Sequence, residues 1–239
     1  MISLKLMQKD WIITGVRGLD ELLQGGVVEG STVALVGPVG TLKSYIGYQF
    51  LCEGLRRNEK CVCINTNQDL DTLDFQMRVN FNYNMKQYVN IGLLRFVYYS
   101  PFLIEYHPPP LGELPTRPSD AGTIRDTIQK IEDDVTRILI CTLSQFFTII
   151  GDERPVIDLV YRLKAKAKRN RGVAVFILDS GVQSRNVEEN VKSICDYVLE
   201  TKEDQTLRKI RIVKALTRHN LEWHKLNLTS EGVQVEPLF

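Results

Sequence analysis

Residues 31–44 have the sequence STVALVGPVGTLKS, in which a short apolar run leads into a glycine-containing loop that ends in Lys43 and Ser44. The run from Ser31 to Val36 has the length and composition of a buried β-strand. Residues 44–57 then place apolar side chains at helical spacing and end in two arginines, which suit the negative end of a helix dipole. A strand, a loop and a helix in this order begin a βαβ unit, so this stretch predicts the α/β class.

The loop matches a phosphate-binding pattern at all but one of its fixed positions. Gly37, Lys43 and Ser44 fit G-x-x-x-x-G-K-[ST], whereas Leu42 stands where the pattern has glycine. Such a loop directs backbone N–H groups at phosphates, its lysine binds the β- and γ-phosphates, and its hydroxyl binds Mg²⁺. The alternative for this motif alone is a strand-to-helix turn with a surface lysine. We expect ATP or ADP, with Mg²⁺ held weakly by Ser44, on the residues Gly37, Pro38, Val39, Gly40, Thr41, Leu42, Lys43 and Ser44.

Leu42 is the position where the loop departs from this pattern. A leucine side chain there either packs into the core beneath the sheet, which leaves the loop usable, or enters the pocket and fills it. Apolar neighbours such as Ile46 on the following helix make inward packing feasible. We therefore expect a pocket that is narrowed but open.

The rest of the chain alternates apolar runs with amphipathic stretches, which is typical of a mostly parallel central sheet flanked by helices. The expected strands cover residues 60–65, 93–99, 137–142 and 173–178, and the expected helices cover 69–79, 120–135, 155–169 and 187–195. Strands alone follow at 197–202, 207–213 and 222–228, which predicts antiparallel C-terminal edge strands. Six of the nine prolines fall between Pro101 and Pro118, so we expect a surface loop or insertion at 101–118 within a single domain spanning 1–239.

Composition and charge exclude several classes of protein. Hydrophobic residues make up 44% of the 239 residues, which is too apolar for intrinsic disorder. Thirty basic and 29 acidic residues leave a formal charge of +1, which gives no global basic excess for nucleic acid. The five scattered cysteines predict buried free thiols. Since no apolar leader or membrane-length apolar run is visible, we expect a cytoplasmic protein without membrane insertion.

A second motif lies upstream of the loop. Residues 14–31, TGVRGLDELLQGGVVEGS, resemble the segment T-G-x-x-G-L-D-x-x-L-x-G-G-x-x-x-G that precedes the phosphate loop in the KaiC and RecA superfamily. The resemblance continues through a Walker B-like strand at 137–142 to residues 226–233, LNLTSEGV, which look like the ending of single-domain archaeal KaiC-like proteins. It implies a RecA-like P-loop NTPase fold that binds ATP, commonly between subunits of a hexameric ring. We therefore expect self-association, as a hexamer or with a related ATPase subunit.

Three positions depart from the family's pattern where hydrolysis needs acidic groups. In KaiC-like ATPases a pair of glutamates primes the attacking water, and the matching residues here are Asn65 and Thr66. An amide orients water but does not take its proton at neutral pH. The Walker B aspartate falls on Cys141, and Mg²⁺ prefers hard oxygen to a thiol. Three aspartates follow nearby, but their place on an expected helix favours solvated surface: Asp69, Asp71 and Asp74.

A basic stretch after a late strand of the family reaches the γ-phosphate bound by the neighbouring subunit. In this sequence Lys214 matches its lysine, Leu216 replaces its arginine, and Arg218 with His219 is shifted. Phosphate contacts across a subunit interface from Lys214, Arg218 and His219 are one interpretation. A charged hairpin loop is the other.

Loss of the general base and of the metal-shell aspartate removes two effects that each commonly contribute roughly 100-fold or more in rate. The sequence therefore predicts a KaiC-like nucleotide-binding or nucleotide-sensing protein with lost or very weak ATP hydrolysis, a pseudo-ATPase that acts as a regulatory or interaction module. One alternative is an active Mg-dependent ATPase with substitute residues, because Lys43 and Ser44 persist. Another is a DNA-associated RecA paralogue in recombination or repair. The basic stretch 164–171 favours this alternative, whereas the nearly neutral overall charge argues against it.

Overall fold

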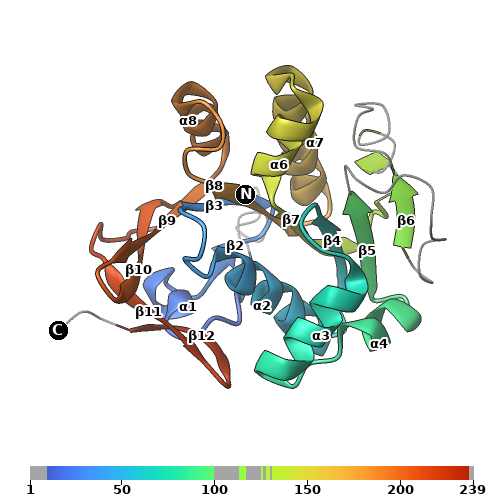
Figure 1. The fold of residues 1–239 in the computed structure, drawn as a ribbon, viewed down its shortest axis with the longest axis horizontal. Coiled ribbons are helices and arrows are strands. Elements are labelled where there is room, and N and C mark those ends of the chain that lie inside the picture. Colours follow the sequence, from blue (N-terminus) through green and yellow to red (C-terminus); the bar gives the residue numbers. More distant parts are fainter. Residues whose placement is uncertain (1–9, 100–112, 117–124, 126–127, 130, 237–239) are drawn as a thin grey trace, which may run out of the picture.

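The apolar runs of the sequence come together in one ten-stranded sheet in the computed structural model (Figure 1). The structure describes residues 10–99, 113–116, 125, 128–129 and 131–236. Across the sheet the strand order is β12-β11-β10-β9-β3-β8-β7-β4-β5-β6. Its strands are β3 (Ser31–Gly37), β4 (Lys60–Asn65), β5 (Leu94–Tyr99), β6 (Glu113–Thr116), β7 (Val135–Cys141), β8 (Val173–Asp179), β9 (Tyr197–Asp204), β10 (Leu207–Lys214), β11 (His224–Thr229) and β12 (Gly232–Glu236).

Strand direction divides this sheet into two parts. All neighbouring pairs from β9 through β3, β8, β7, β4 and β5 to β6 are parallel. The pairs β9–β10, β10–β11 and β11–β12 are antiparallel. The α/β class, the mostly parallel sheet and the antiparallel C-terminal edge are thus confirmed.

Helices cover both faces of the sheet, as Figure 1 shows. The helices on one face are α1 (Leu19–Leu22), α2 (Lys43–Arg56), α3 (Leu70–Phe81) and α4 (Met85–Asn90). Those on the other face are α6 (Leu143–Ile150), α7 (Glu153–Arg169) and α8 (Arg185–Ile194). Because the parallel strands are covered on both sides, β3 is buried along its whole length and reads as a continuous apolar run. Each face has its own apolar core, one built around α2 and the other around α7.

Several elements differ from the sequence-based expectations. Half of the helix expected at 120–135 falls on residues outside those described; the described residues 125, 128 and 129 are helical, whereas the last residue, Val135, begins β7 and pairs with Lys60. The loop expected at 101–118 also falls mostly outside them, and its described part forms β6. Among the described residues this strand pairs with β5 alone, so it lies at the edge of the sheet, where a proline is tolerated.

Short elements were missed because few residues carry their pattern. They are α1, α4, α6, β12 and the two-stranded sheet of β1 (Trp11–Ile12) and β2 (Val27–Val28). Helix α6 is apolar over most of its length, and it ends at Gly151, whose φ of 69° suits glycine. Within the described part of the chain, no helix combines the length and apolar character needed to cross a bilayer.

Candidate nucleotide-binding site

A cavity of about 660 Å³ opens where β3, β7 and β8 end and α2 begins. The carboxyl ends of parallel strands on either side of such a loop are where ligands bind in open α/β sheets. Residues of the phosphate loop, of the start of α2 and of distant segments border this cavity. They are Val39, Gly40, Thr41, Leu42, Lys43, Ser44, Tyr45, Thr66, Asn67, Gln76, Tyr98, Thr142, Gln145 and Asp179.

The loop between β3 and α2 is held by its neighbours. At Gly37 a Cβ would overlap the hydroxyl and carbonyl oxygens of Thr201 on β9, so only glycine fits there. The Thr41 hydroxyl lies 2.7 Å from both the Pro38 carbonyl oxygen and the Thr201 hydroxyl. From β10, Arg208 Nε donates to the Gly40 carbonyl at 2.9 Å. These contacts fix the loop from outside and leave its inner side to the cavity.

Leu42 takes the backbone conformation that explains the glycine of the phosphate-binding pattern. Its φ of 67° and ψ of 10° are left-handed, which L side chains adopt at a cost of about 1–2 kcal/mol. The side chain is 8% exposed and belongs to the apolar core that also contains Ile46. Inward packing therefore occurs, as the sequence predicted, and the cavity stays open beside it.

Helix α2 offers its N-terminus to this cavity. It begins at Lys43, and its N-cap residue Leu42 makes no side-chain hydrogen bond to the first turn. The first N–H groups of a helix have no intrahelical partner, and together with the helix dipole they favour an anion. The start of α2 therefore has backbone N–H groups available to an anion.

The Lys43 ammonium contacts two oxygen atoms beside the cavity. It donates to the Pro38 carbonyl at 2.6 Å and forms an ion pair with Asp179 Oδ1 at 3.0 Å. Burial lowers the pKa of Lys43, and the Asp179 carboxylate opposes that shift. Asp179 is not among the residues predicted from the sequence, although an apolar strand, β8, that ends in an acidic residue is a signal for it.

The side chains of Asn65 and Thr66 make hydrogen bonds inside the protein. Asn65 is fully buried; its Nδ2 donates to the Tyr48 hydroxyl at 3.0 Å, and its Oδ1 accepts from the backbone N–H of Asn67 at 2.8 Å. The Thr66 hydroxyl accepts from the backbone N–H of Thr142 at 3.0 Å. Neither side chain can act as a general base in this arrangement, and each one joins β4 to its neighbours.

Cys141 lies beneath the start of α2. Its thiol donates to the Ser44 hydroxyl at 3.4 Å and lies 3.3 Å from the Tyr48 hydroxyl. Burial raises the pKa of this thiol, so it is neutral at pH 7 and a poor partner for Mg²⁺. The next residue, Thr142, has a hydroxyl oxygen that is buried without a hydrogen-bond partner among the described residues. All five cysteines are buried free thiols.

The three aspartates after β4 have different surroundings. Asp69 caps α3 by accepting from the backbone N–H of Thr72, and Asp71 is exposed beside Lys86. Asp74 departs from the expected solvated surface: its side chain is 6% exposed, pairs with Arg78 at 2.7 Å and accepts from the backbone N–H of Lys86. Its carboxylate joins α3 to α4, and none of the three borders the cavity.

Comparison with known proteins agrees with this geometry. The family model "ATPase: KaiC" matches residues 12–238. The chain belongs to the KaiC ATPase family. A UPF0273 protein of Aeropyrum pernix is 27% identical over 95% of this chain and 94% of its own length. The circadian clock protein KaiC3 of Synechocystis is 26% identical over 94% of this chain, which spans 45% of that relative.

A solved structure shows the fold of this family. The KaiC-like protein of Pyrococcus horikoshii superimposes with a TM-score of 0.75 over 96% of this chain and all of its own, at 19% sequence identity. The RecA-like fold expected from residues 14–44 is thus confirmed.

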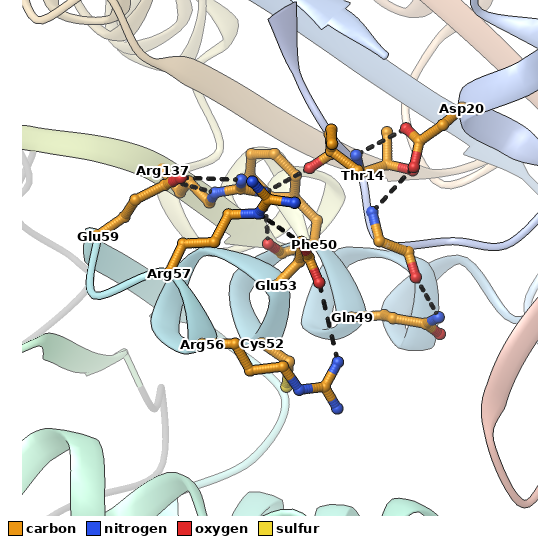
Figure 2. Close-up of polar contacts among 12 residues, drawn as sticks. Thr14, Asp20, Gln49, Phe50, Cys52, Glu53, Arg56, Arg57, Glu59 and Arg137 are labelled. Carbon is orange, nitrogen blue, oxygen red and sulfur yellow. Dashed lines mark hydrogen bonds and ion pairs between the residues drawn. The ribbon is translucent and has the colours of Figure 1, made fainter. Parts of the chain in front are cut away.

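The upstream motif of this KaiC-family chain, residues 14–31, makes structural contacts that join α2 to other parts of the fold. Asp20 accepts from the backbone N–H groups of Thr14 and Gly15, and Gln49 on α2 donates to the Gly15 carbonyl at 2.7 Å (Figure 2). Gln49 Oε1 also accepts from the backbone N–H of Val233 on β12 at 2.8 Å. The motif therefore ties the helix that follows the phosphate loop to the C-terminal edge of the sheet.

The same region contains a buried arginine of β7, Arg137. It is 1% exposed, pairs with Glu59 at 2.6 Å and donates to the carbonyls of Ile13 and Phe50 (Figure 2). These bonds satisfy the guanidinium inside the protein. Its partners leave it no role at the cavity.

The residues considered for contacts across a subunit interface divide into two groups. Lys214 Nζ donates to the carbonyls of Ser193 and Cys195 at 2.9 and 2.6 Å, so it closes the C-terminal end of α8. Arg218 and His219 lie in the connection between β10 and β11, where Arg218 is exposed and His219 Nδ1 is 3.0 Å from the Thr217 carbonyl.

Strand direction places this connection away from the chain's own phosphate loop. Strand β10 begins at Leu207 beside Arg208, which contacts Gly40, and it ends at Lys214. The seven steps between these ends correspond to roughly 23 Å of extended strand. The connection therefore begins at the end of β10 that is remote from the chain's own phosphate loop.

Proposed function

We propose that this KaiC-family chain binds ATP or ADP on residues 37–44 and hydrolyses ATP very slowly or not at all, so that it works as a nucleotide-sensing or interaction module. The observation that carries the proposal is the contrast between the residues that line the cavity and the residues that stand where the family has acidic groups. Lys43, Ser44 and the N-terminus of α2 border the cavity. Asn65 and Cys141 are buried outside its lining and are engaged in hydrogen bonds with Tyr48 and Ser44.

The residues present fit a nucleotide better than they fit the usual magnesium shell. Mg²⁺ takes oxygen ligands in proteins, most often one or two carboxylates with phosphates and water. Ser44 and Thr142, which border the cavity, carry hydroxyl oxygens, whereas Cys141 carries a thiol. When bound with the nucleotide, Mg²⁺ would neutralise phosphate charge, and the side chains of the loop would orient the phosphates.

The assembly of the chain is part of this proposal. We propose a single domain that associates with further copies or with a related ATPase subunit, in the way the KaiC resemblance implies. Its support is the position of Arg218 and His219 at the end of the sheet away from their own phosphate loop. A nucleotide held between chains would then report assembly as well as ligand.

An active ATPase with substitute residues is the second candidate. Asp179 is the observation in its favour, because it brings a carboxylate to the cavity and touches Lys43. That carboxylate is engaged in the ion pair with Lys43, however, so it is not free to orient an attacking water.

A DNA-associated function has less support. The basic stretch 164–171 is largely engaged in ion pairs with acidic side chains. Lys164 pairs with Asp196, Lys166 with Asp133, and Arg171 with Glu29 and Asp10, all within 3.2 Å. A cation that is already paired with a carboxylate gains less binding free energy from a phosphate. This surface is therefore poorly suited to bind nucleic acid.

Titration calorimetry with ATP and ADP, together with a turnover assay, tests the proposal on the purified full chain. We expect saturable binding, loss of binding in Lys43→Ala with an unchanged melting temperature, and a turnover number well below about 1 per second. The matched control is Lys225→Ala, a half-exposed lysine of β11 that borders no part of the cavity. Binding that survives Lys43→Ala would place the nucleotide elsewhere, and ordinary turnover would favour the active enzyme.

A further inference from the structure

Asp179 is the one carboxylate that borders the cavity among the described residues. It ends β8 directly beside the phosphate loop, since β3 and β8 pair in register from Ser31 with Val173 to Gly37 with Asp179. Its side chain is 13% exposed, and its backbone N–H donates to Ser144 Oγ at 2.7 Å. The backbone bond fixes this position independently of the carboxylate.

The level of Asp179 along the sheet differs from that of Cys141. Ile140 of β7 pairs with Phe176 of β8, so Cys141 is one residue beyond that pair and Asp179 is three residues beyond it. Strand β8 thus carries its acidic group about 7 Å further towards the loop than β7 carries its thiol. The carboxylate lies level with the start of the phosphate loop, whereas the thiol lies beneath it.

A hydroxyl on a residue that borders this cavity has no hydrogen-bond partner among the described residues. Thr142 is 2% exposed and borders the cavity, and this hydroxyl is its buried Oγ1. An unsatisfied buried hydroxyl is destabilising, so such groups usually have a ligand or water. Ser44 Oγ contributes a third oxygen from the start of α2.

We propose that Asp179, with the hydroxyls of Thr142 and Ser44, is a divalent-cation site that takes the place of the lost carboxylate at Cys141. The inference rests on the proposed nucleotide binding, because phosphate oxygens complete the cation's shell. Without a cation, Asp179 holds Lys43 and repels phosphate. With a cation, the carboxylate binds the metal and Lys43 is free for the phosphates, so nucleotide affinity depends on Mg²⁺.

Two variants separate the parts of this site. Asp179→Asn removes the charge and keeps the size and the backbone bond to Ser144. Thr142→Val removes only the unpartnered hydroxyl and keeps the ion pair between Lys43 and Asp179. The control is Asp133→Asn, which breaks another aspartate–lysine ion pair, with Lys166. Asp133 comes just before β7 begins, so it lies at the opposite end of this strand from the cavity.

Calorimetric titration of ATP is carried out on each full-length protein in excess EDTA and in excess MgCl₂. For the natural sequence and Asp133→Asn we expect Mg²⁺ to tighten ATP binding by about tenfold or more, which is about 1.4 kcal/mol. Asp179→Asn should bind ATP roughly tenfold more tightly in EDTA, and Mg²⁺ should then change its affinity by less than about twofold. Thr142→Val should keep the EDTA affinity of the natural sequence and show a smaller effect of Mg²⁺.

The outcomes distinguish the two proposals. If the natural sequence binds ATP and Asp179→Asn keeps the full Mg²⁺ effect, the cation site is wrong while the nucleotide site stands. The cation site is equally wrong if Asp179→Asn tightens binding in EDTA yet still responds to Mg²⁺ as before, since Asp179 is then only the partner of Lys43. If no protein binds ATP in either solution, the proposed function fails and the cation site fails with it.

Discussion

Leu42 shows how one side chain can alter a loop without closing it. Its left-handed backbone is the conformation for which the phosphate-binding pattern uses glycine, and its side chain packs in the apolar core at the border of the cavity without filling it. The residue therefore combines a backbone strain of about 1–2 kcal/mol with a burial that offsets it. Both terms change together when the residue is replaced.

Leu42→Gly should make the loop a better phosphate site and the protein less stable. We expect ATP to bind about tenfold more tightly, because the glycine lets the backbone approach the phosphates. The free energy of unfolding should fall by about 1–3 kcal/mol, since the loss of a buried leucine outweighs the relief of strain. Calorimetry and urea unfolding measure the two effects, and Leu42→Ala controls for the lost burial alone. Affinity equal to that of the natural sequence would show that the leucine never limited the site.

The residues that replace the acidic groups can be tested as a set. Restoring Asn65→Glu, Thr66→Glu and Cys141→Asp together should raise ATP turnover by about 100-fold or more if the cavity admits Mg-ATP. Single changes should do little and should destabilise, because each breaks a buried hydrogen bond. A phosphate-release assay on proteins matched for melting temperature decides this. A folded triple variant that binds ATP without faster turnover would show that further groups are missing.

Individual elements are joined by polar contacts at their ends, and Asp196 is the clearest case. It lies between α8 and β9, pairs with Lys164 of α7 at 2.7 Å and accepts from the Thr32 backbone N–H and hydroxyl of β3 at 3.0 and 2.9 Å. Burial alone would raise the pKa of this carboxyl, but the hydrogen bonds from Lys164 and Thr32 outweigh it and lower the pKa. The strand that carries the phosphate loop is thus anchored at its other end by one carboxylate.

This lowered pKa predicts how stability depends on pH. A carboxyl whose pKa is lower in the folded state stabilises it above the unfolded pKa of about 3.9, and the contribution is lost as pH falls through the folded pKa. Asp196→Asn should therefore cost about 1–2 kcal/mol of unfolding free energy at pH 7, and the difference from the natural sequence should shrink below about pH 4. Urea unfolding at several pH values measures this, with Asp204→Asn, an exposed partner of Lys209, as the control. A difference that stays constant down to pH 3 would contradict the assignment.

The order of the sheet explains which parts of the molecule the sequence could predict. The phosphate loop, its flanking strand and helix, and the long elements follow from local patterns, and they were predicted within a few residues. The ion pair of Lys43 with Asp179 was not predicted, because it depends on β8 lying beside β3. The paired residues of these two strands are more than 130 positions apart in sequence. The hydrogen bonds that immobilise Asn65 likewise come from neighbours that only the folded sheet brings together. The burial of Asp74 depends on the packing of α3 against α4, which helical periodicity does not reveal.

The assembled state decides the role of the connection between β10 and β11. Arg218 is exposed in a connection that begins at the end of β10 remote from the chain's own phosphate loop, so we expect a phosphate that it contacts to belong to another chain. We expect the protein to associate in the presence of ATP and Arg218→Ala to weaken ATP binding by about tenfold in the associated state, since a charge-assisted hydrogen bond contributes about 1.5–3 kcal/mol. The variant should match the natural sequence when both are dilute and monomeric.

Sedimentation velocity and ATP titrations at matched protein concentrations separate these effects. Arg162→Ala is the control, because this half-exposed arginine of α7 pairs with Asp158 within its own helix. Lys214→Ala should instead lower the melting temperature at every concentration, since Lys214 binds the carbonyls that end α8. An ATP-bound protein that remains monomeric at high concentration would contradict the contact across subunits and leave Arg218 and His219 as a charged surface loop.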